Sequence, residues 1–123
     1  MQDQAIVQAL AQTLYDRKAC DIVALNVSKL TVLCDYMLLA SGRTARQVAA
    51  LYDALGERAA ELGLTLHRSE GQTESRWIVL DYGHLMVHLF HQEERAYYNL
   101  ERLWEDGDNR VPLPFDQTVE TLS

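Results

Sequence analysis

The chain has 123 residues, of which 48% are hydrophobic and 24% are charged, and its formal net charge is −7. This length suits one domain, and the composition excludes a largely disordered chain. The 18 acidic side chains outnumber the 11 lysines and arginines, which argues against broad nucleic-acid binding and suits a basic protein as partner.

The N-terminal sequence and the cysteine usage predict a cytoplasmic protein. The first ten residues, MQDQAIVQAL, contain neither a basic leader nor a continuous apolar stretch, so we expect no signal peptide. No apolar run reaches the roughly 20 residues that a membrane span needs. Cys20 and Cys34 are expected to be buried, reduced thiols, because a chain of this length does not need a disulfide.

A helix followed by two strands is predicted for the N-terminal third of the chain. Apolar side chains at helical spacing predict a helix over residues 3–18, and Asp3 can cap its start. Residues 21–27 and 35–41 are rich in branched and other apolar residues, with almost no polar alternation. That pattern is typical of strands that are covered on both faces.

The second helix is marked by its sequence at both ends. It follows Gly42, and Thr44 and Gln47 have the spacing of a capping box, in which side chains satisfy the first backbone donors. Gly63 is a natural C-terminal stop. The expected buried stripe consists of Val48, Leu51, Leu55, Ala59 and Leu62.

Three strands and a helix are predicted for the second half of the chain. The strands are residues 64–70, 76–82 and 85–91, and a tight turn that starts at Gly83 joins the last two. A final helix is predicted over residues 93–104. Its expected inner side consists of Ala96, Tyr97, Leu100, Leu103 and Trp104.

This order of elements predicts an α/β fold with a mixed sheet of about five strands and helices packed on it. One domain is expected over residues 1–106. Residues 107–123 contain acidic side chains, two prolines and few apolar residues, so we expect a loosely ordered acidic tail there.

Three histidines lie close in sequence, but their pattern does not favour a metal site. His84 and His88 share one side of the predicted strand, whereas His91 points to the other side, because strand side chains alternate. A pair of histidines lacks the third and fourth ligands that zinc requires. We therefore expect neither a metal nor another cofactor.

The segment before the second helix is the best candidate for chemistry. Ser41 precedes a helix start, where a phosphate can bind, and Arg43 and Arg46 lie nearby. A nucleotidyl-transfer site would also need paired carboxylates for magnesium, whereas Asp21 and Asp81 each stand alone. The simpler interpretation is a strand end followed by a helix cap, so no catalytic residue is predicted. A nucleotide-binding or nucleotidyltransferase-like enzyme remains the alternative.

Aromatic and acidic residues at two strand starts indicate a binding surface. Trp77 follows a polar loop, and Asp35 and Tyr36 begin an earlier strand in the same way. Exposed aromatic side chains beside carboxylates are typical of interface hot spots. Alternation places Trp77 and Asp81 on one side of their strand and Tyr82 on the other, but both sides are apolar. Burial of Trp77 and Tyr82 in the core is therefore an equally good interpretation.

Three longer segments carry a family resemblance. They are DYMLLASGRTARQV, the run WIVLDYGHLMVHLF from Trp77 to Phe90, and RAYYNLERLW. With these segments the sequence resembles the ribosomal silencing factor family, which is also called the RsfS or Iojap family. The similar region extends from Asp21 to Asp106. The resemblance implies a fold similar to that of nucleotidyltransferases, without their catalytic residues.

The resemblance also implies a function. Members of the family bind the large ribosomal subunit through its protein fourteen, on the face that meets the small subunit. They thereby block subunit joining and repress translation when nutrients are scarce, and they form homodimers off the ribosome. For this chain the resemblance implies a translation repressor and not an enzyme, with little or no direct contact with nucleic acid. A homodimeric scaffold unrelated to ribosomes is a second alternative.

Eight residues are candidates for contact with the partner. Carboxylates are expected to pair with lysines and arginines of a basic ribosomal protein, and aromatic side chains are expected to act as anchors. One local departure from the family is His84, where members commonly have an acid, so no charge contact is predicted for the hairpin tip. The candidates are Asp35, Tyr36, Glu70, Trp77, Asp81, Tyr82, Met86 and His88.

Overall fold

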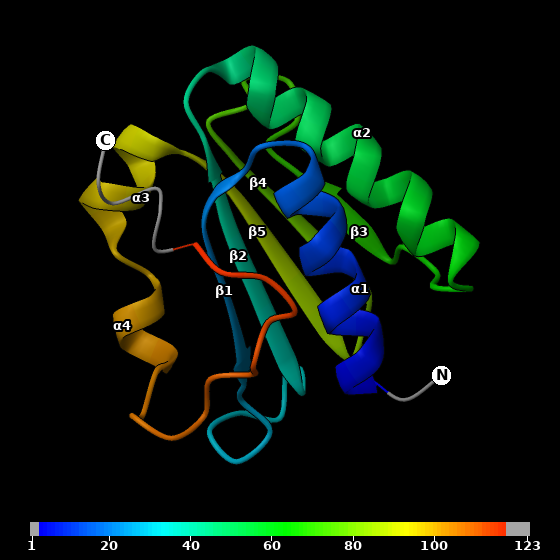
Figure 1. Cartoon of the computed structure of the whole chain (residues 1–123), viewed down its shortest axis with the longest axis vertical. Coiled ribbons are helices and arrows are strands. Elements are labelled where there is room, and N and C mark those ends of the chain that lie inside the picture. Colours follow the sequence, from blue (N-terminus) through cyan, green and yellow to red (C-terminus); the bar gives the residue numbers. More distant parts are fainter. Residues whose placement is uncertain (1–2, 118–123) are drawn as a thin grey trace.

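Within residues 3–117, which the computed structural model describes, five strands form one sheet. They are β1 (Cys20–Asn26), β2 (Tyr36–Gly42), β3 (Arg68–Glu70), β4 (Trp77–Asp81) and β5 (Leu85–His91). Their order across the sheet is β1-β2-β5-β4-β3 (Figure 1). β2 and β5 run parallel, and the other neighbours run antiparallel. The predicted mixed α/β sheet is therefore confirmed.

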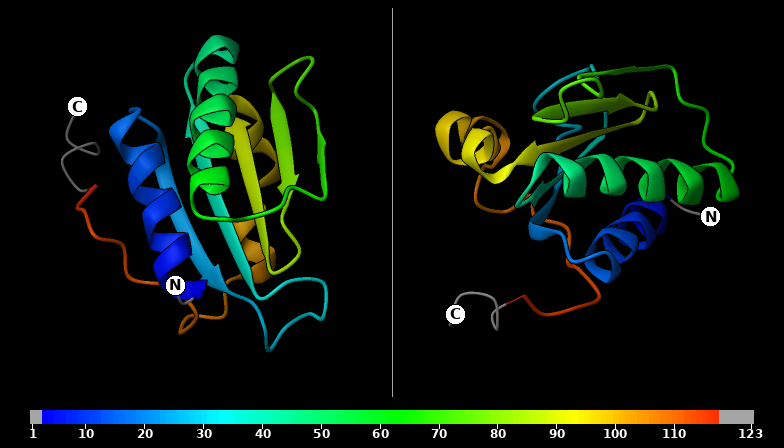
Figure 2. Two further views of the ribbon diagram at one scale, coloured as in Figure 1. Left: turned by 90° about the vertical axis from the view of Figure 1, so that its right-hand side faces the viewer. Right: turned by 90° about the horizontal axis from the view of Figure 1, so that it is seen from above.

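Two long helices cover one face of the sheet. α1 (Asp3–Asp16) and α2 (Ala45–Glu61) lie side by side on that face (Figures 1 and 2). The short helices α3 (Gln92–Tyr98) and α4 (Glu101–Trp104) lie apart from this pair. Leu100, just before α4, and Trp104 within it pack against the opposite sheet face. In the part of the chain that the structure describes, no helix is long and apolar enough to cross a bilayer.

The two ends of α2 have the contacts that their residues predict. The Thr44 side chain accepts a hydrogen bond from the Gln47 backbone N–H at 3.0 Å. At the other end Gly63 adopts a φ of 83°, and its N–H donates to the carbonyl of Ala60. The Leu64 N–H donates to the carbonyl of Ala59, five residues earlier, which completes a glycine-dependent C-terminal cap. The predicted helix, its caps and its stripe are confirmed, although Leu62 is only half-buried.

Apolar side chains are buried on both faces of the sheet. The cluster under α1 and α2 is the larger one, and its fully buried side chains include Leu10, Leu14, Leu38, Leu51, Leu55, Ile78, Leu80, Val87 and Leu89. The second cluster lies on the opposite face and consists of Val23, Leu25, Val27, Cys34, Met37, Leu39 and Phe90. This arrangement explains the continuous apolar runs in β1, β2 and β5, because their residues are covered on both sides.

The expected final helix is two helices instead of one. Asn99 adopts a left-handed conformation, with φ 49° and ψ 49°, which ends α3 after Tyr98. Asparagine tolerates this conformation better than most residues. The break changes which side chains face the sheet, so Tyr97 and Leu103 are exposed by 81% and 75%, although a continuous helix predicts them on the inner side. Ala96, also expected on that side, is exposed.

The segment after Gly107 is more ordered than its composition suggests. Arg110 pairs with Leu25, and the Val111 N–H donates to the Ala24 carbonyl at 2.8 Å. The Gln117 side chain bonds both the N–H and the carbonyl of Ile22. Residues 110–117 therefore cover the edge of β1, which would otherwise present unpaired backbone groups. The rest of the expected tail, residues 118–123, lies outside the described residues.

Candidate partner-binding surface

Six side chains of β3, β4 and β5 form a surface that α1 and α2 do not cover. Ile78 and Leu80 are 0% exposed and belong to the cluster under the helices, so their neighbours along β4 project to the other face. Residues of β5 that pair with these β4 neighbours lie on the same face. Val79 pairs with His88, and Asp81 pairs with Met86. We call this surface the open face; it consists of Glu70, Trp77, Val79, Asp81, Met86 and His88.

Trp77 is the largest side chain of the open face, and three contacts hold it. Its rings stack on Phe90 with centroids 5.0 Å apart, and Tyr98 lies 5.0 Å away at a tilt of 44°. Its indole N–H donates a hydrogen bond to Nδ1 of His88 at 3.1 Å. Trp77 is therefore a half-buried aromatic side chain in a fixed orientation, which is the kind of group that anchors protein interfaces.

His88 supports Trp77 and offers little surface of its own. It is 6% exposed, and burial together with the positive charge of Arg95 lowers its pKa to about 4. The imidazole is therefore neutral near pH 7, and because Nδ1 accepts from Trp77, its proton is on Nε2. Nε2 is buried and has no hydrogen-bond partner among the described residues. His88 consequently helps to orient Trp77 and carries no positive charge near pH 7.

A buried arginine holds the short helices onto the end of the sheet. Arg95 is 6% exposed and donates to Glu101 at 2.8 Å, to the Ser41 hydroxyl at 2.9 Å and to the Asp21 carbonyl at 2.7 Å. Burial alone would raise the pKa of Glu101, but the hydrogen bond and charge of Arg95 lower it overall. Arg95 also lies 5.9 Å from the centroid of the Phe90 ring. It thereby links α3 and α4 to β1 and β2, and it lies over Phe90 of β5, on which Trp77 stacks.

The residues considered for nucleotidyl transfer do not converge. Ser41 is 0% exposed and is bonded to Arg95. Asp21 lies near the start of β1, beside the strand end that carries Ser41, whereas Asp81 lies at the far end of β4, in register with Met86. The two carboxylates therefore do not form the pair that a magnesium site beside Ser41 would need.

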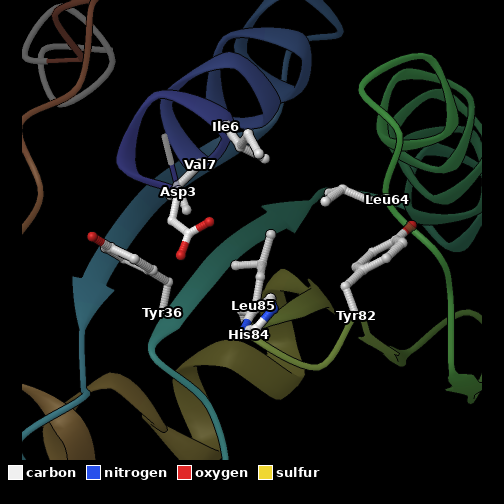
Figure 3. Close-up of a pocket in the computed structure, with 8 residues that line it drawn as sticks. All are labelled: Asp3, Ile6, Val7, Tyr36, Leu64, Tyr82, His84 and Leu85. Atoms are coloured by element: carbon white, nitrogen blue, oxygen red, sulfur yellow. The ribbon is translucent and has the colours of Figure 1, made fainter. Parts of the chain in front are cut away.

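Two of the predicted contact residues lie on the helix-covered side of the sheet. Tyr82 is 6% exposed and belongs to the cluster under α1 and α2, where burial raises its pKa. Tyr36 packs against the same cluster and lines a small pocket at the start of α1. Figure 3 shows the two rings on either side of Leu85 in this pocket. Tyr82 is too buried to offer a partner much contact area, so it is no longer a candidate. Tyr36 lies on the helix-covered side, away from the open face.

The other candidates are brought together by the sheet. Glu70, Trp77, Asp81, Met86 and His88 all belong to the open face. Asp35 directly precedes β2, and its carboxylate lies 3.8 Å from Nδ1 of His84 at the hairpin tip.

Sequence reasoning overlooked Tyr98, because the break at Asn99 could not be foreseen from apolar spacing. It also overlooked the loop between β1 and β2, where Leu30, Val32 and Leu33 are exposed.

Potential metal ligands near the start of α3 are already engaged within the protein. His91, Glu93 and Glu94 place ligand atoms within 4.8 Å of one another. Arg76, however, forms ion pairs with both glutamates. Nδ1 of His91 accepts a hydrogen bond from the Glu93 backbone N–H and so caps the helix. The group is explained by ion pairing and capping.

Comparison with known proteins identifies the relatives of this chain. Residues 1–122 match the family model described as ribosomal silencing factor during starvation. A protein named ribosomal silencing factor RsfS from Halalkalibacterium halodurans is 40% identical over 87% of this chain and 92% of its own length. Its namesake from Bacillus subtilis is 38% identical over 87% and 91%, respectively. The chloroplastic protein Iojap of Zea mays is 29% identical over 88% of this chain and 46% of its own length.

Solved structures of related proteins have the same fold. A crystal structure from Bacillus halodurans superposes with a TM-score of 0.78 at 38% identity, over 90% of this chain and all of that one. One from Chromobacterium violaceum gives a TM-score of 0.82 at 33% identity, over 96% and 97% of the two chains. The family match, the related sequences and the solved structures each cover most of this chain. This chain belongs to the ribosomal silencing factor family.

Proposed function

We propose that this protein binds the large ribosomal subunit through its protein fourteen and sterically blocks joining of the small subunit, which represses translation under nutrient limitation. Family membership supports the silencing role, because the matching proteins are named as ribosomal silencing factors. The action proposed is regulatory and requires no covalent chemistry. Off the ribosome, in the cytoplasm, we propose that the protein forms a homodimer.

The open face is the observation that carries this proposal. Trp77, Val79 and Met86 form an apolar centre that remains partly exposed although the opposite sheet face is sealed by helices. Glu70 and Asp81 lie at its margin on β3 and β4. An apolar centre with a polar rim is the usual anatomy of a protein interface. The carboxylates and the net charge of −7 suit a partner rich in lysine and arginine.

Size alone makes a steric mechanism feasible. A folded chain of this length has a radius of gyration of roughly 14 Å. A body of that size, bound where the two subunits meet, would occupy space that the small subunit needs. Repression would then depend on affinity and position, and it would be reversed by dissociation.

Sedimentation with separated ribosomal subunits tests the proposal. We expect the purified protein to comigrate with the large subunit and not with the small one. Trp77→Ala should weaken this binding by about 2 kcal/mol or more, which is roughly thirtyfold, because it removes the aromatic anchor. Tyr97→Ala, which truncates an exposed aromatic side chain outside the open face, serves as the control. Wild-type protein that sediments with neither subunit, or Trp77→Ala that binds like wild type while remaining folded, would contradict the proposal.

A further inference from the structure

A cleft lies beside the open face, between the loop at residues 71–76 and α3. Its volume is about 390 Å³, which is enough for one long side chain. Its walls include Glu74, Arg76, Trp77, Glu94 and Tyr98. The cleft is therefore continuous with the proposed interface through Trp77, which belongs to both.

The cleft has two aromatic walls. The rings of Trp77 and Tyr98 are 5.0 Å apart and tilted by 44°, and Tyr98 is 51% exposed. Trp77 is held in place by its stack on Phe90 and its hydrogen bond to His88. Aromatic faces carry a negative partial charge, so they attract a cation that lies against them.

The charges of the cleft leave one carboxylate available. Arg76, the single cation among the residues that line the cleft, forms ion pairs with Glu93 and Glu94. Glu74 is exposed, and among residues 3–117 it has no ion-pair or hydrogen-bond partner. The cleft consequently has a free negative charge next to two aromatic rings, and its own arginine is neutralised.

We propose that this cleft binds one arginine side chain of the bound protein, with the guanidinium against the rings of Trp77 and Tyr98 and paired with Glu74. The inference rests on the proposed function and names the chemistry that the partner contributes. Arginine fits better than lysine because its planar group stacks on aromatic rings while it bonds a carboxylate. A phosphate is disfavoured, since Glu74 and the paired glutamates would repel it.

Two matched pairs of variants test the cleft in the complex. Glu74→Gln removes the charge and Tyr98→Leu removes the ring, and each should weaken binding to large subunits about three- to tenfold. Glu57→Gln on the exposed side of α2 and Tyr15→Leu on α1, whose ring stacks on Phe115 and does not line the cleft, are the controls and should change affinity less than twofold. If Glu74→Gln and Tyr98→Leu bind as their controls do, the inference is wrong even though the protein binds ribosomes.

A small probe separates this inference from the proposed function. The amide of N-acetyl-arginine, titrated at millimolar concentration into the protein alone, should shift the NMR signals of the Trp77 indole and the Tyr98 ring. The shift should be smaller with the corresponding lysine amide and absent in Glu74→Gln. If the arginine probe binds but the protein does not sediment with large subunits, the proposed function is wrong and the cleft is still an arginine site. No shift with either probe, or an equal shift with lysine, would overturn the arginine site.

Discussion

The two faces of the sheet are both apolar, but they differ in what covers them. On β4, Ile78 and Leu80 lie under α1 and α2 and are 0% exposed. Their immediate neighbours Trp77, Val79 and Asp81 lie on the open face and remain partly exposed. One short strand therefore contributes to stability with one set of residues and to the proposed interface with the other. Adjacent substitutions should separate the two roles.

Ile78→Ala and Val79→Ala give the largest expected contrast. Ile78→Ala should lower the free energy of unfolding by about 2–5 kcal/mol, because it leaves a cavity in a closed core. Val79→Ala should cost no more than about 1 kcal/mol, since its side chain is already in contact with water. Unfolding in urea measures both. Equal losses would show that the open face is as much a part of the core as the helix-covered face.

Arg95→Met tests how the short helices are held over the second cluster. Removing the guanidinium leaves Glu101, the Ser41 hydroxyl and the Asp21 carbonyl without their donor. We expect a loss of about 2–3 kcal/mol in unfolding free energy, because buried acceptors would lose their partner. Arg58→Met is the control, since Arg58 pairs with Glu61 on the surface and such pairs contribute about 0–1 kcal/mol. If Arg95→Met loses no more unfolding free energy than Arg58→Met, the buried Arg95–Glu101 pair has no structural role.

The buried His88 predicts a specific loss of stability in acid. Its pKa is about 4 in the folded protein, compared with 6.5 when unfolded, so the unfolded chain binds more protons between these values. Stability should therefore fall as the pH decreases through this window, by about 2 kcal/mol between pH 7 and pH 5. His88→Asn should remove this part of the pH dependence, whereas His84→Asn, at an exposed position, should retain it. An unchanged pH profile in His88→Asn would mean that His88 is not buried in the neutral form.

Local signals in the sequence predicted elements better than they predicted surfaces. The ends of α2 could be placed because Thr44 and Gly63 act on backbone groups a few residues away. Strand alternation separated Trp77 from Tyr82, but it could not tell which side the helices cover, because both sides are apolar. Which side of β4 is covered depends on where α1 and α2 pack, and that is a property of the whole fold. The break at Asn99 likewise depends on a single left-handed residue that apolar spacing does not reveal.

The order of residues 110–117 was missed for a similar reason. Proline and acidic residues suggested a loose tail, but Val111 is buried and its N–H pairs with β1. An edge strand with unpaired backbone groups provides the partner, and composition alone carries no information about that edge. The candidate residues were therefore chosen by residue type, and it is the strand register of the structure that places Glu70, Trp77 and Asp81 on one face.

The smallest expected effect concerns how Trp77 is oriented on the open face. His88→Leu removes the acceptor of the indole N–H, whereas His88→Asn returns an acceptor close to the position of Nδ1. We expect binding to large subunits to weaken about fivefold in the leucine variant and less in the asparagine variant, because one hydrogen bond contributes about 1 kcal/mol. Hydrogen exchange of the Trp77 indole, followed in a Trp104→Phe background that leaves one tryptophan signal, should be faster only in the leucine variant. Equal behaviour of the two variants would mean that the stack on Phe90 orients Trp77 without the hydrogen bond, and the open face would then depend on ring packing alone.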